Sequence, residues 1–399
     1  MVAATGSIER ARTLLELRRP ADAERELRGV LAQDPQHATA HSFLALALVG
    51  QGNAADAVAE AHEAVRLAPD HWFPHYVAGH VHYRTRRPDQ AMEAIRASLA
   101  LSPEHAPTWS LLARTHMLKG QWREMADAAG RGLALDPEQS EPASLLSLAH
   151  TALGEAEPAQ AAAEQAVRLD PENATAHLVY GRAALAFGDP RRAADAFREV
   201  LRLDPGFDQA RDLLVVALKQ RNPIYRWLAR LQGRFRGGWR LLFLLPAVPP
   251  VIAVFVLIAL LHWAAWLAEA WTTLRLARAK ATQLLFEGAD ARVAVLSCCL
   301  AVVGAAGLAA GIALGQEAVG TAGVAVMALV TPVQEAAHTG SSRGRAVLYG
   351  WAGLLALAIA TSVVVASVGP ALLSAYAALA TIWVASGVRR LFRGDQAPA

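Results

Sequence analysis

Histidine is the residue whose spacing in this sequence most suggests chemistry. Nine of the 13 histidines fall into three sets whose members stand at multiples of 34 residues. The sets are His37, His71 and His105; His82, His116 and His150; and His41, His75 and His177. Imidazole is a common ligand of transition metals, so a regular series could form a row of metal sites. No cysteine and no Glu-x-x-His group accompanies these histidines, because the only cysteines are Cys298 and Cys299 in a later apolar run.

Motifs of catalytic residues are absent from the sequence. It contains no Gly-x-Ser-x-Gly nucleophile turn, no His-Glu-x-x-His zinc motif and no phosphate-binding loop. The ionisable residues nearest the middle of an apolar run are His262 and Glu269, and we expect both at a membrane interface because Trp263, Trp266 and Trp271 surround them. We therefore predict no enzymatic activity and no cofactor.

The elements that carry the histidines are set by prolines. Six prolines follow one another at intervals of 34 residues: Pro35, Pro69, Pro103, Pro137, Pro171 and Pro205. Proline lacks an N–H and restricts the residue before it, so each proline ends one helix and begins the next. Twelve residues before each proline stands a small or flexible apolar residue, which lets helices approach closely: Ala23, Ala57, Ala91, Met125, Ala159 and Ala193. The period predicts a stack of helix pairs.

This pattern resembles the tetratricopeptide repeat. When the first repeat starts at Ala4, Trp109 occupies the family's tryptophan position 4 and Phe197 occupies position 24. Leucine stands at position 7 in three repeats, at Leu44, Leu112 and Leu146, and Ala or Gly stands at position 8 at Ala45, Gly79, Ala113 and Gly181. The first repeat has Arg10 at position 7, as expected of a terminal repeat. The resemblance implies an all-α superhelical solenoid of about six repeats over residues 4–222, with residues 208–219 as a capping helix.

In this family the first helix of each repeat lines a concave groove that binds peptides. Carrying the groove positions onto this sequence gives seven candidate residues: Tyr76, His80, Tyr83, Arg84, Arg114, Met117 and Arg182. Arginine can engage carboxylate with two parallel hydrogen bonds, so the set suits a protein or peptide partner that carries an acidic group. The alternative is that these arginines are solvated surface charges.

The resemblance also gives the histidines a structural interpretation. His82, His116 and His150 occupy position 11, where the family places an aromatic residue between helices, and His41, His75 and His177 occupy the tryptophan position. We expect imidazole there to act as a smaller aromatic ring with one ring hydrogen bond, and we predict no metal site.

Charge separates the two halves of the chain. Residues 223–399 hold 14 Lys and Arg against 6 Asp and Glu, a net of +8, whereas residues 1–222 have a net charge of −5. The cations of the second half flank apolar runs, which is typical of a membrane domain and not of a nucleic-acid-binding surface. Residues 1–20 carry several charges and no uninterrupted apolar segment, so we expect the repeats to stay in the cytosol.

Residues 223–240 are predicted to form a basic amphipathic helix in the headgroup layer. Its candidate interface residues are Arg226, Trp227, Arg230, Arg234, Arg236, Trp239 and Arg240. A helix docked on the last repeat is the alternative.

The membrane domain is predicted over residues 241–392. Its apolar runs are 241–271, 293–314, 318–334, 346–366 and 370–388. The glycines between Gly304 and Gly323 should let two of these helices pack closely. If the basic segments after 271, at 343–345 and after 388 are all cytosolic, the last four runs form two hairpins. The stretch 241–271 would then be re-entrant, with a turn at Pro246, Pro249 and Pro250; the alternative is a full crossing.

The arrangement resembles a broad group of bacterial membrane proteins, in which repeats run into an Arg-Asn-Pro-x-Tyr-Arg segment, here Arg221 to Arg226, and then into apolar helices. The resemblance implies a multi-pass protein of the bacterial inner membrane. We expect a scaffold or adaptor that holds a protein or peptide partner at the lipid bilayer, alone or as a homo- or hetero-oligomer. The alternative is a regulatory or structural subunit of a membrane transporter or channel.

Overall fold

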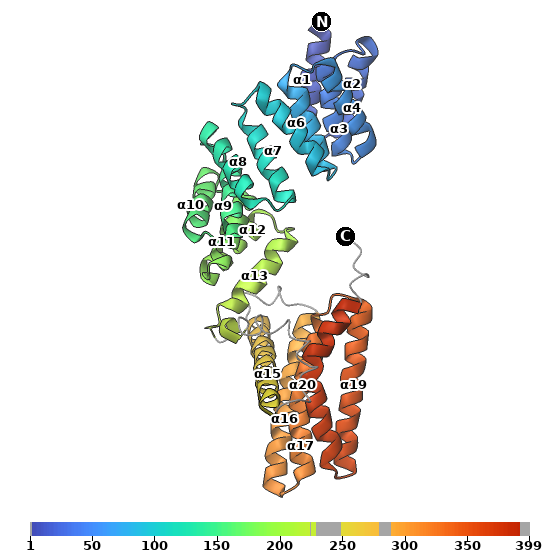
Figure 1. The fold of residues 1–399 in the computed structure, drawn as a ribbon, viewed down its shortest axis with the longest axis vertical. Coiled ribbons are helices and arrows are strands. Elements are labelled where there is room, and N and C mark those ends of the chain that lie inside the picture. Colours follow the sequence, from blue (N-terminus) through green and yellow to red (C-terminus); the bar gives the residue numbers. More distant parts are fainter. Residues whose placement is uncertain (1, 224, 229–248, 279–288, 392–399) are drawn as a thin grey trace. The chain divides into compact units, whose positions relative to one another are not determined.

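The computed structural model describes residues 2–223, 225–228, 249–278 and 289–391, and every regular element in these ranges is a helix. The chain divides into two compact units, Met1–Leu214 and Val215–Ala399, so the division falls inside one helix, α13. Figure 1 shows the helices of each unit in chain order. This confirms the predicted all-α fold class.

The first unit is built from pairs of helices, here called helix A and helix B of each repeat. The A helices are α1 (Val2–Glu16), α3 (Ala38–Gly50), α5 (Trp72–Arg84), α7 (Ala106–Leu118), α9 (Ser140–Leu153) and α11 (Ala174–Ala186). The B helices are α2 (Pro20–Gln33), α4 (Ala54–Leu67), α6 (Pro88–Leu101), α8 (Trp122–Leu135), α10 (Ala156–Leu169) and α12 (Pro190–Leu203). Helix α13 (Asp208–Gln220) follows and contains the predicted capping segment 208–219.

The prolines of the 34-residue period stand where they were expected. Each lies two residues beyond the last residue of a B helix; Pro35, for example, follows the C-cap Asp34 of α2. The six apolar residues twelve positions earlier all have a relative exposure of 0%. They are Ala23, Ala57, Ala91, Met125, Ala159 and Ala193. The prediction that small residues allow close helix packing at this position is confirmed.

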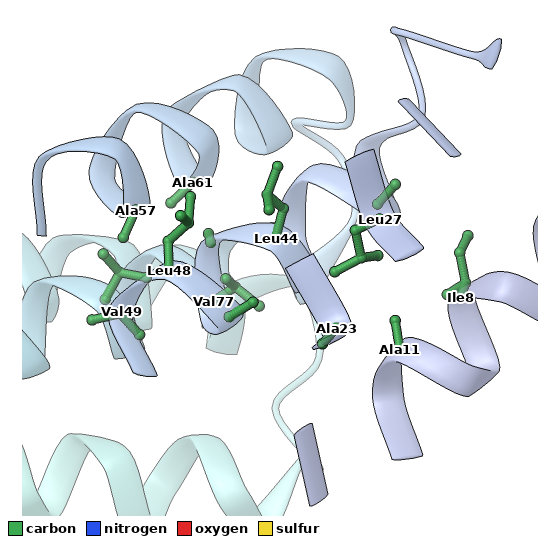
Figure 2. Close-up of a cluster of buried hydrophobic side chains, with 14 of the residues drawn as sticks. Ile8, Ala11, Ala23, Leu27, Leu44, Leu48, Val49, Ala57, Ala61 and Val77 are labelled. Carbon is green, nitrogen blue, oxygen red and sulfur yellow. The ribbon is translucent and has the colours of Figure 1, made fainter. Parts of the chain in front are cut away.

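Neighbouring repeats share their core. Figure 2 shows one cluster in which Ala23 and Leu27 of α2, Leu44 of α3, Ala61 of α4 and Val77 of α5 are buried together. Between α11 and α12 the helices approach so closely that a Cβ added at Gly181 would lie 2.5 Å from the ring of Phe197. Glycine at repeat position 8 therefore makes room for the phenylalanine at position 24.

The histidines at the tryptophan position act as substitutes for tryptophan. Trp109 donates its Nε1 hydrogen to the carbonyl oxygen of Pro103 at 2.7 Å. His75 and His177 donate from Nε2 to the equivalent carbonyls of Pro69 and Pro171 at 2.8 and 2.9 Å, and His41 does the same to Pro35 at 3.0 Å. Because a carbonyl oxygen only accepts, the contact fixes Nε2 as the protonated nitrogen. The predicted single ring hydrogen bond is found for His75 and His177, whereas His41 has a second one, from its Nδ1 to the carboxylate of Glu60 at 2.5 Å.

The second unit contains six helices after α13 within the described residues. They are α15 (Pro249–Arg278), α16 (Ala289–Leu314), α17 (Glu317–Ala328), α18 (Val330–Ala337), α19 (Ser342–Val364) and α20 (Val368–Leu391). Five segments are long and apolar enough to cross a membrane, with α17 and α18 counted together as Glu317–Ala337. Four of them contain most of the predicted runs after residue 292, and the fifth, Val256–Ala277, lies in α15. Residues 241–248 lie outside the described part.

Helices α16 and α17 pack through glycine, as predicted. A Cβ added at Gly311 would lie 2.2 Å from the backbone nitrogen of Gly320, and one at Gly323 would lie 2.3 Å from the nitrogen of Leu308. No side chain fits between the two backbones at these points, so van der Waals contact of the helices depends on the missing Cβ atoms.

One end of the second unit gathers its buried charges. Lys219, in the last turn of α13, donates to Glu269 of α15 at 2.9 Å, and His338 lies 3.4 Å from the same carboxylate. Beside His338, Glu335 accepts a hydrogen bond of 2.6 Å from Arg389 of α20, and its relative exposure is 1%. The unit therefore begins and ends at the same end of its helices.

His262 and Glu269, which we expect at a membrane interface, are covered by other parts of the second unit. His262 is 1% exposed and Trp266 is also 1% exposed, because both are covered by protein. Glu269 is mostly covered as well, with its side chain 12% exposed. Their surroundings are other helices, a fact that the spacing of tryptophans could not reveal. Their depth in a bilayer stays a prediction.

Candidate binding surface

The seven candidate groove residues lie on three A helices, α5, α7 and α11. Three A helices, α3, α5 and α11, begin at a side chain that caps their free N–H groups, whereas the N-cap residue of α7, His105, forms no such bond. His71 accepts from the N–H of Phe73 at 3.2 Å to cap α5, and His37 does the same for α3. Asn173 accepts from Thr175 at 2.9 Å to cap α11. Thus His37 and His71 of the first histidine set position the A helices.

An aromatic group forms the start of the candidate surface on α5. The ring of Trp72 lies 4.2 Å from that of His105, centroid to centroid, and Tyr76 meets the same imidazole edge-on at 5.4 Å. Tyr76 and Tyr83 are half-buried against the cores of their repeats. Burial raises the pKa of Tyr76, and the negative charge of Glu141 raises it further, so the phenol stays protonated. The group offers flat apolar faces with hydroxyl donors.

Positive charge surrounds His80 on the same helix. Burial, together with the positive charges of Arg84 and Arg114, lowers the pKa of His80 to about 4. The imidazole of His80 is consequently neutral at physiological pH, so Arg84 and Arg114 carry the positive charge near it. Its Nδ1 is buried and forms no hydrogen bond with any residue in the described ranges. Arg84 is exposed.

Arg114 is already paired within the chain. Its guanidinium forms an ion pair with the carboxylate of Glu141, at the start of α9 in the next repeat. Both side chains are about two-fifths exposed, 42% and 40%, so a ligand can reach them. We did not single out Glu141 from the sequence, although it occupies repeat position 2, one of the positions that line the groove in this family. The sign of its charge should have marked it as the partner of an arginine one repeat earlier.

The remaining candidates differ in their surroundings. Met117 is half-buried and packs against the core shared by the third to fifth repeats. Arg182 on α11 is exposed and forms no ion pair within the described ranges. Electrostatic interactions therefore link His80 to Arg84 and Arg114, and Tyr76 to Arg114, whereas none in the described ranges links Arg182 to these residues.

The candidate interface residues are described only in part. Arg226 is half-buried and Trp227 is 58% exposed, which fits an interfacial position for the indole. Arg230, Arg234, Arg236, Trp239 and Arg240 lie outside the described residues.

No group of three or more His, Cys, Asp or Glu side chains in the described ranges is placed to hold a metal ion. Two histidines at position 11 have local partners instead: the Nδ1 of His116 lies 2.8 Å from Gln121 Oε1, and that of His150 lies 2.6 Å from Glu155 Oε2.

Comparison with known proteins supports the repeats. Residues 8–71 and 145–206 match a family model described as tetratricopeptide repeat, so these segments are tetratricopeptide repeats. No curated protein matches the sequence.

Several solved structures are similar over about half of the chain. A chain of the APC/C hetero-tetramer Cut9–Hcn1 has 21% identity and a TM-score of 0.49, with 54% of this chain and 42% of that chain covered. This chain thus spans less than half the length of that one. Pseudomonas aeruginosa pilF has 21% identity and a TM-score of 0.46, with 53% and 97% covered. PilW, a type IV pilus biogenesis factor, has 17% identity and a TM-score of 0.48, with 53% and 98% covered.

Proposed function

We propose that this protein is a membrane-anchored adaptor whose repeats bind a protein or peptide partner and hold it at the bacterial inner membrane. The observation that carries the proposal is that one chain joins tetratricopeptide repeats to five helices suited to cross a bilayer. Proteins with such repeats generally mediate protein–protein interaction. Tethering a binding surface to a membrane raises the effective concentration of its ligand there without any catalysis.

The candidate surface suits an extended or helical segment with an acidic group. Trp72 and Tyr76 supply apolar faces, and Arg84 supplies an exposed guanidinium at the other end of the same helix. Because His80 is neutral, the arginines provide the positive charge of this patch. A carboxylate of the ligand would compete with Glu141 for Arg114. The ligand therefore pairs with Arg114 only if its interaction with the guanidinium is stronger than that of Glu141.

Exposed apolar side chains support a lipid environment for the second unit. Val302 and Ile312 of α16 are 69% and 73% exposed, and Leu357 and Val364 of α19 are 63% and 85% exposed. Water would solvate such faces poorly, and a soluble protein seldom exposes them on several long helices. Lipid chains solvate them, while the backbone polar groups are satisfied within the helices.

The contacts at one end of the second unit favour a topology. Lys219 and Asn222 bond Glu269 and Thr272 at the end of the unit where α15 finishes. Arg389 bonds Glu335 at this same end, so the basic segments near Arg275, Arg343 and Arg389 share it. The turns at the other ends of these helices, at residues 315–316 and 365–367, carry no positive charge. The positive-inside bias then supports a cytosolic position for Lys219, the basic segments and the repeats.

The length of α15 allows a full crossing, the alternative to a re-entrant arm; because α15 finishes at the end of the unit where Lys219 lies, the chain must reach the opposite end between Gln220 and Pro249. The helix is continuous for 30 residues, from Pro249 to Arg278. At 1.5 Å per residue it is about 45 Å long, whereas the hydrocarbon core is about 30 Å thick. The path to Pro249 runs through residues 229–248, outside the described part of the chain.

Labelling of single cysteines tests the topology. In a variant without Cys298 and Cys299, a cysteine at the exposed Gln316 should react with a membrane-impermeant maleimide added to spheroplasts, and one at the exposed Ser342 should react only after lysis. The reverse pattern, or recovery of the protein in the soluble fraction after ultracentrifugation, would rule the proposal out.

Binding is tested with the full chain in detergent micelles as bait for cytosolic proteins. The wild type should retain a specific protein, and the double variant Arg84→Glu and Arg114→Glu should lose it. Arg168→Glu, at an exposed site on α10 away from these helices, is the matched control. Equal retention by wild type and double variant would show that this surface is not the binding site.

A transporter or channel subunit is the second candidate, because Glu335 is buried in the second unit and Glu269 lies close to Lys219 and His338. Intramembrane ionisable groups often mark a transport path. Ion flux in proteoliposomes that contain only this protein would support a pore. A loss of flux in Glu335→Gln would show that the ion path passes Glu335.

A further inference from the structure

A hollow of about 410 Å³ opens between α4, α5 and α6, apart from the candidate groove residues. It is lined by His62, Val65, His75, Ala78, His82, Gln90, Glu93, Ala94 and Ala97. On α5 the lining residues His75, Ala78 and His82 are offset by about 150° from the groove residues Tyr76, His80 and Arg84, at about 100° per residue. One helix thus carries two separate surfaces.

Two residues of the lining are smaller in this repeat than in several others. Repeat position 7 holds Leu44, Leu112 and Leu146 in the second, fourth and fifth repeats, but Ala78 in the third. Position 26 holds Ala97 here, whereas the equivalent residues Glu63, Arg131 and Glu199 are long and charged. The third repeat therefore carries a small side chain at both positions.

His82 lacks the partner that its equivalents have. The Nδ1 atoms of His116 and His150 meet Gln121 and Glu155, but the third repeat places Arg87 at that position. The side chain of His82 is 5% exposed, and its Nδ1 has no hydrogen-bond partner in the described ranges. A buried imidazole nitrogen without a partner costs free energy, which a ligand that bonds to it would recover. The ring of His62 lies 5.6 Å from that of His82.

The lining presents acceptors and no cation. His75 uses its Nε2 hydrogen for Pro69, which leaves its Nδ1 as an acceptor. Burial lowers the pKa of His82, and the charges of His62 and Arg87 lower it further, so it adds no positive charge at neutral pH. Glu93 is exposed and forms no ion pair within the described ranges, and the lining contains neither Lys nor Arg.

We propose that this hollow binds a cationic side chain, arginine or lysine, of a peptide segment. The carboxylate of Glu93 and the amide oxygen of Gln90 accept its N–H groups, and the imidazoles of His62 and His82 supply ring faces against which a planar guanidinium packs. The volume lies within the range of small-ligand sites. The inference is independent of the candidate groove, since the charge that it recognises is of opposite sign.

A second hollow supplies an internal control. It is lined by α10, α11 and α12 at the same repeat positions, displaced by 102 residues, and its volume is about 480 Å³. Asp195 replaces Glu93 there but is paired with Arg198 at 2.5 Å, and Glu164 lies 3.9 Å from Arg168. Because Asp195 and Glu164 are already paired with arginines, we expect the second hollow to bind a cationic side chain much more weakly.

Peptide display on the full chain in nanodiscs tests the proposal. Random peptides are selected on the wild type and counter-screened on Ala78→Leu, which fills the hollow with the residue that three other repeats carry. Peptides that bind the wild type and fail on Ala78→Leu should be enriched in Arg or Lys. Glu93→Gln should weaken their affinity at least fivefold, whereas Asp195→Asn should change it less than twofold.

Three results would overturn the inference: no peptide distinguishes wild type from Ala78→Leu, the distinguishing peptides are acidic or purely apolar, or Glu93→Gln leaves their affinity unchanged. Circular dichroism of each variant establishes that the repeats remain folded. Arg84→Glu, in the candidate groove, should leave these peptides bound, so failure here and failure of the groove proposal are separate outcomes.

Discussion

Arg114 and Glu141 form an ion pair that joins one repeat to the next across the candidate binding surface. Because both side chains are about 40% exposed, the pair contributes at most about 1 kcal/mol to folding. Its greater consequence is for binding, since it occupies a guanidinium that the proposed acidic ligand requires.

Releasing Arg114 should therefore strengthen binding. We expect Glu141→Gln to lower the dissociation constant of the captured partner threefold or more, and Arg114→Gln to raise it by at least as much. The double variant should behave like Arg114→Gln, because Glu141 acts through Arg114. Isothermal titration of the three variants measures this, and weaker binding by Glu141→Gln would show that the pair serves structure alone.

His80 should make the stability of the repeats depend on pH. Its pKa is about 4 in the folded protein, against about 6.5 in an unfolded chain. Between these values the unfolded state binds a proton that the folded state does not, so the free energy of unfolding falls as pH falls from about 7 to 4. The loss that His80 adds should be about 1–3 kcal/mol and should disappear in His80→Gln. Urea unfolding at several pH values, compared between the two proteins, checks the difference.

Gly181 should tolerate no side chain. An added Cβ would strike the fully buried ring of Phe197, so Gly181→Ala should lower the free energy of unfolding by about 1–3 kcal/mol. Gly130 lies inside α8 with open space around it, and Gly130→Ala should instead be neutral or stabilise by up to about 1 kcal/mol. Thermal unfolding of both variants, followed by circular dichroism, separates steric cost from helix propensity; equal effects would refute the close approach.

The glycine contact of α16 and α17 should be needed for the second unit to assemble. Gly323→Leu would push a side chain into the backbone of α16, whereas Gly353→Leu, with open space around it in α19, is a matched addition of the same bulk. We expect the first variant to lose its monodisperse peak in detergent size-exclusion chromatography and the second to keep it. Unchanged behaviour of Gly323→Leu would mean that the two helices do not pack as closely as described.

Much of the fold could be predicted from the sequence because its signals are periodic or local. The 34-residue spacing of Pro35 and its equivalents marks every helix pair, and apolar length marks the five candidate spans. Repeat position also predicted that His75 and His177 would serve as aromatic substitutes, since the position fixes their neighbours. These features depend on distances along the chain, which a sequence states directly.

Which polar groups find partners was decided only by the tertiary structure. Glu141 meets Arg114 and Glu335 meets Arg389, whereas the Nδ1 of His82 has no hydrogen-bond partner among the described residues, although its equivalents are bonded. Such contacts depend on how side chains from different helices are packed against one another, to within an ångström. The repeat pattern alone therefore indicated where the candidate binding helices are, and packing decided which of their charges are already paired and where a hollow was left open.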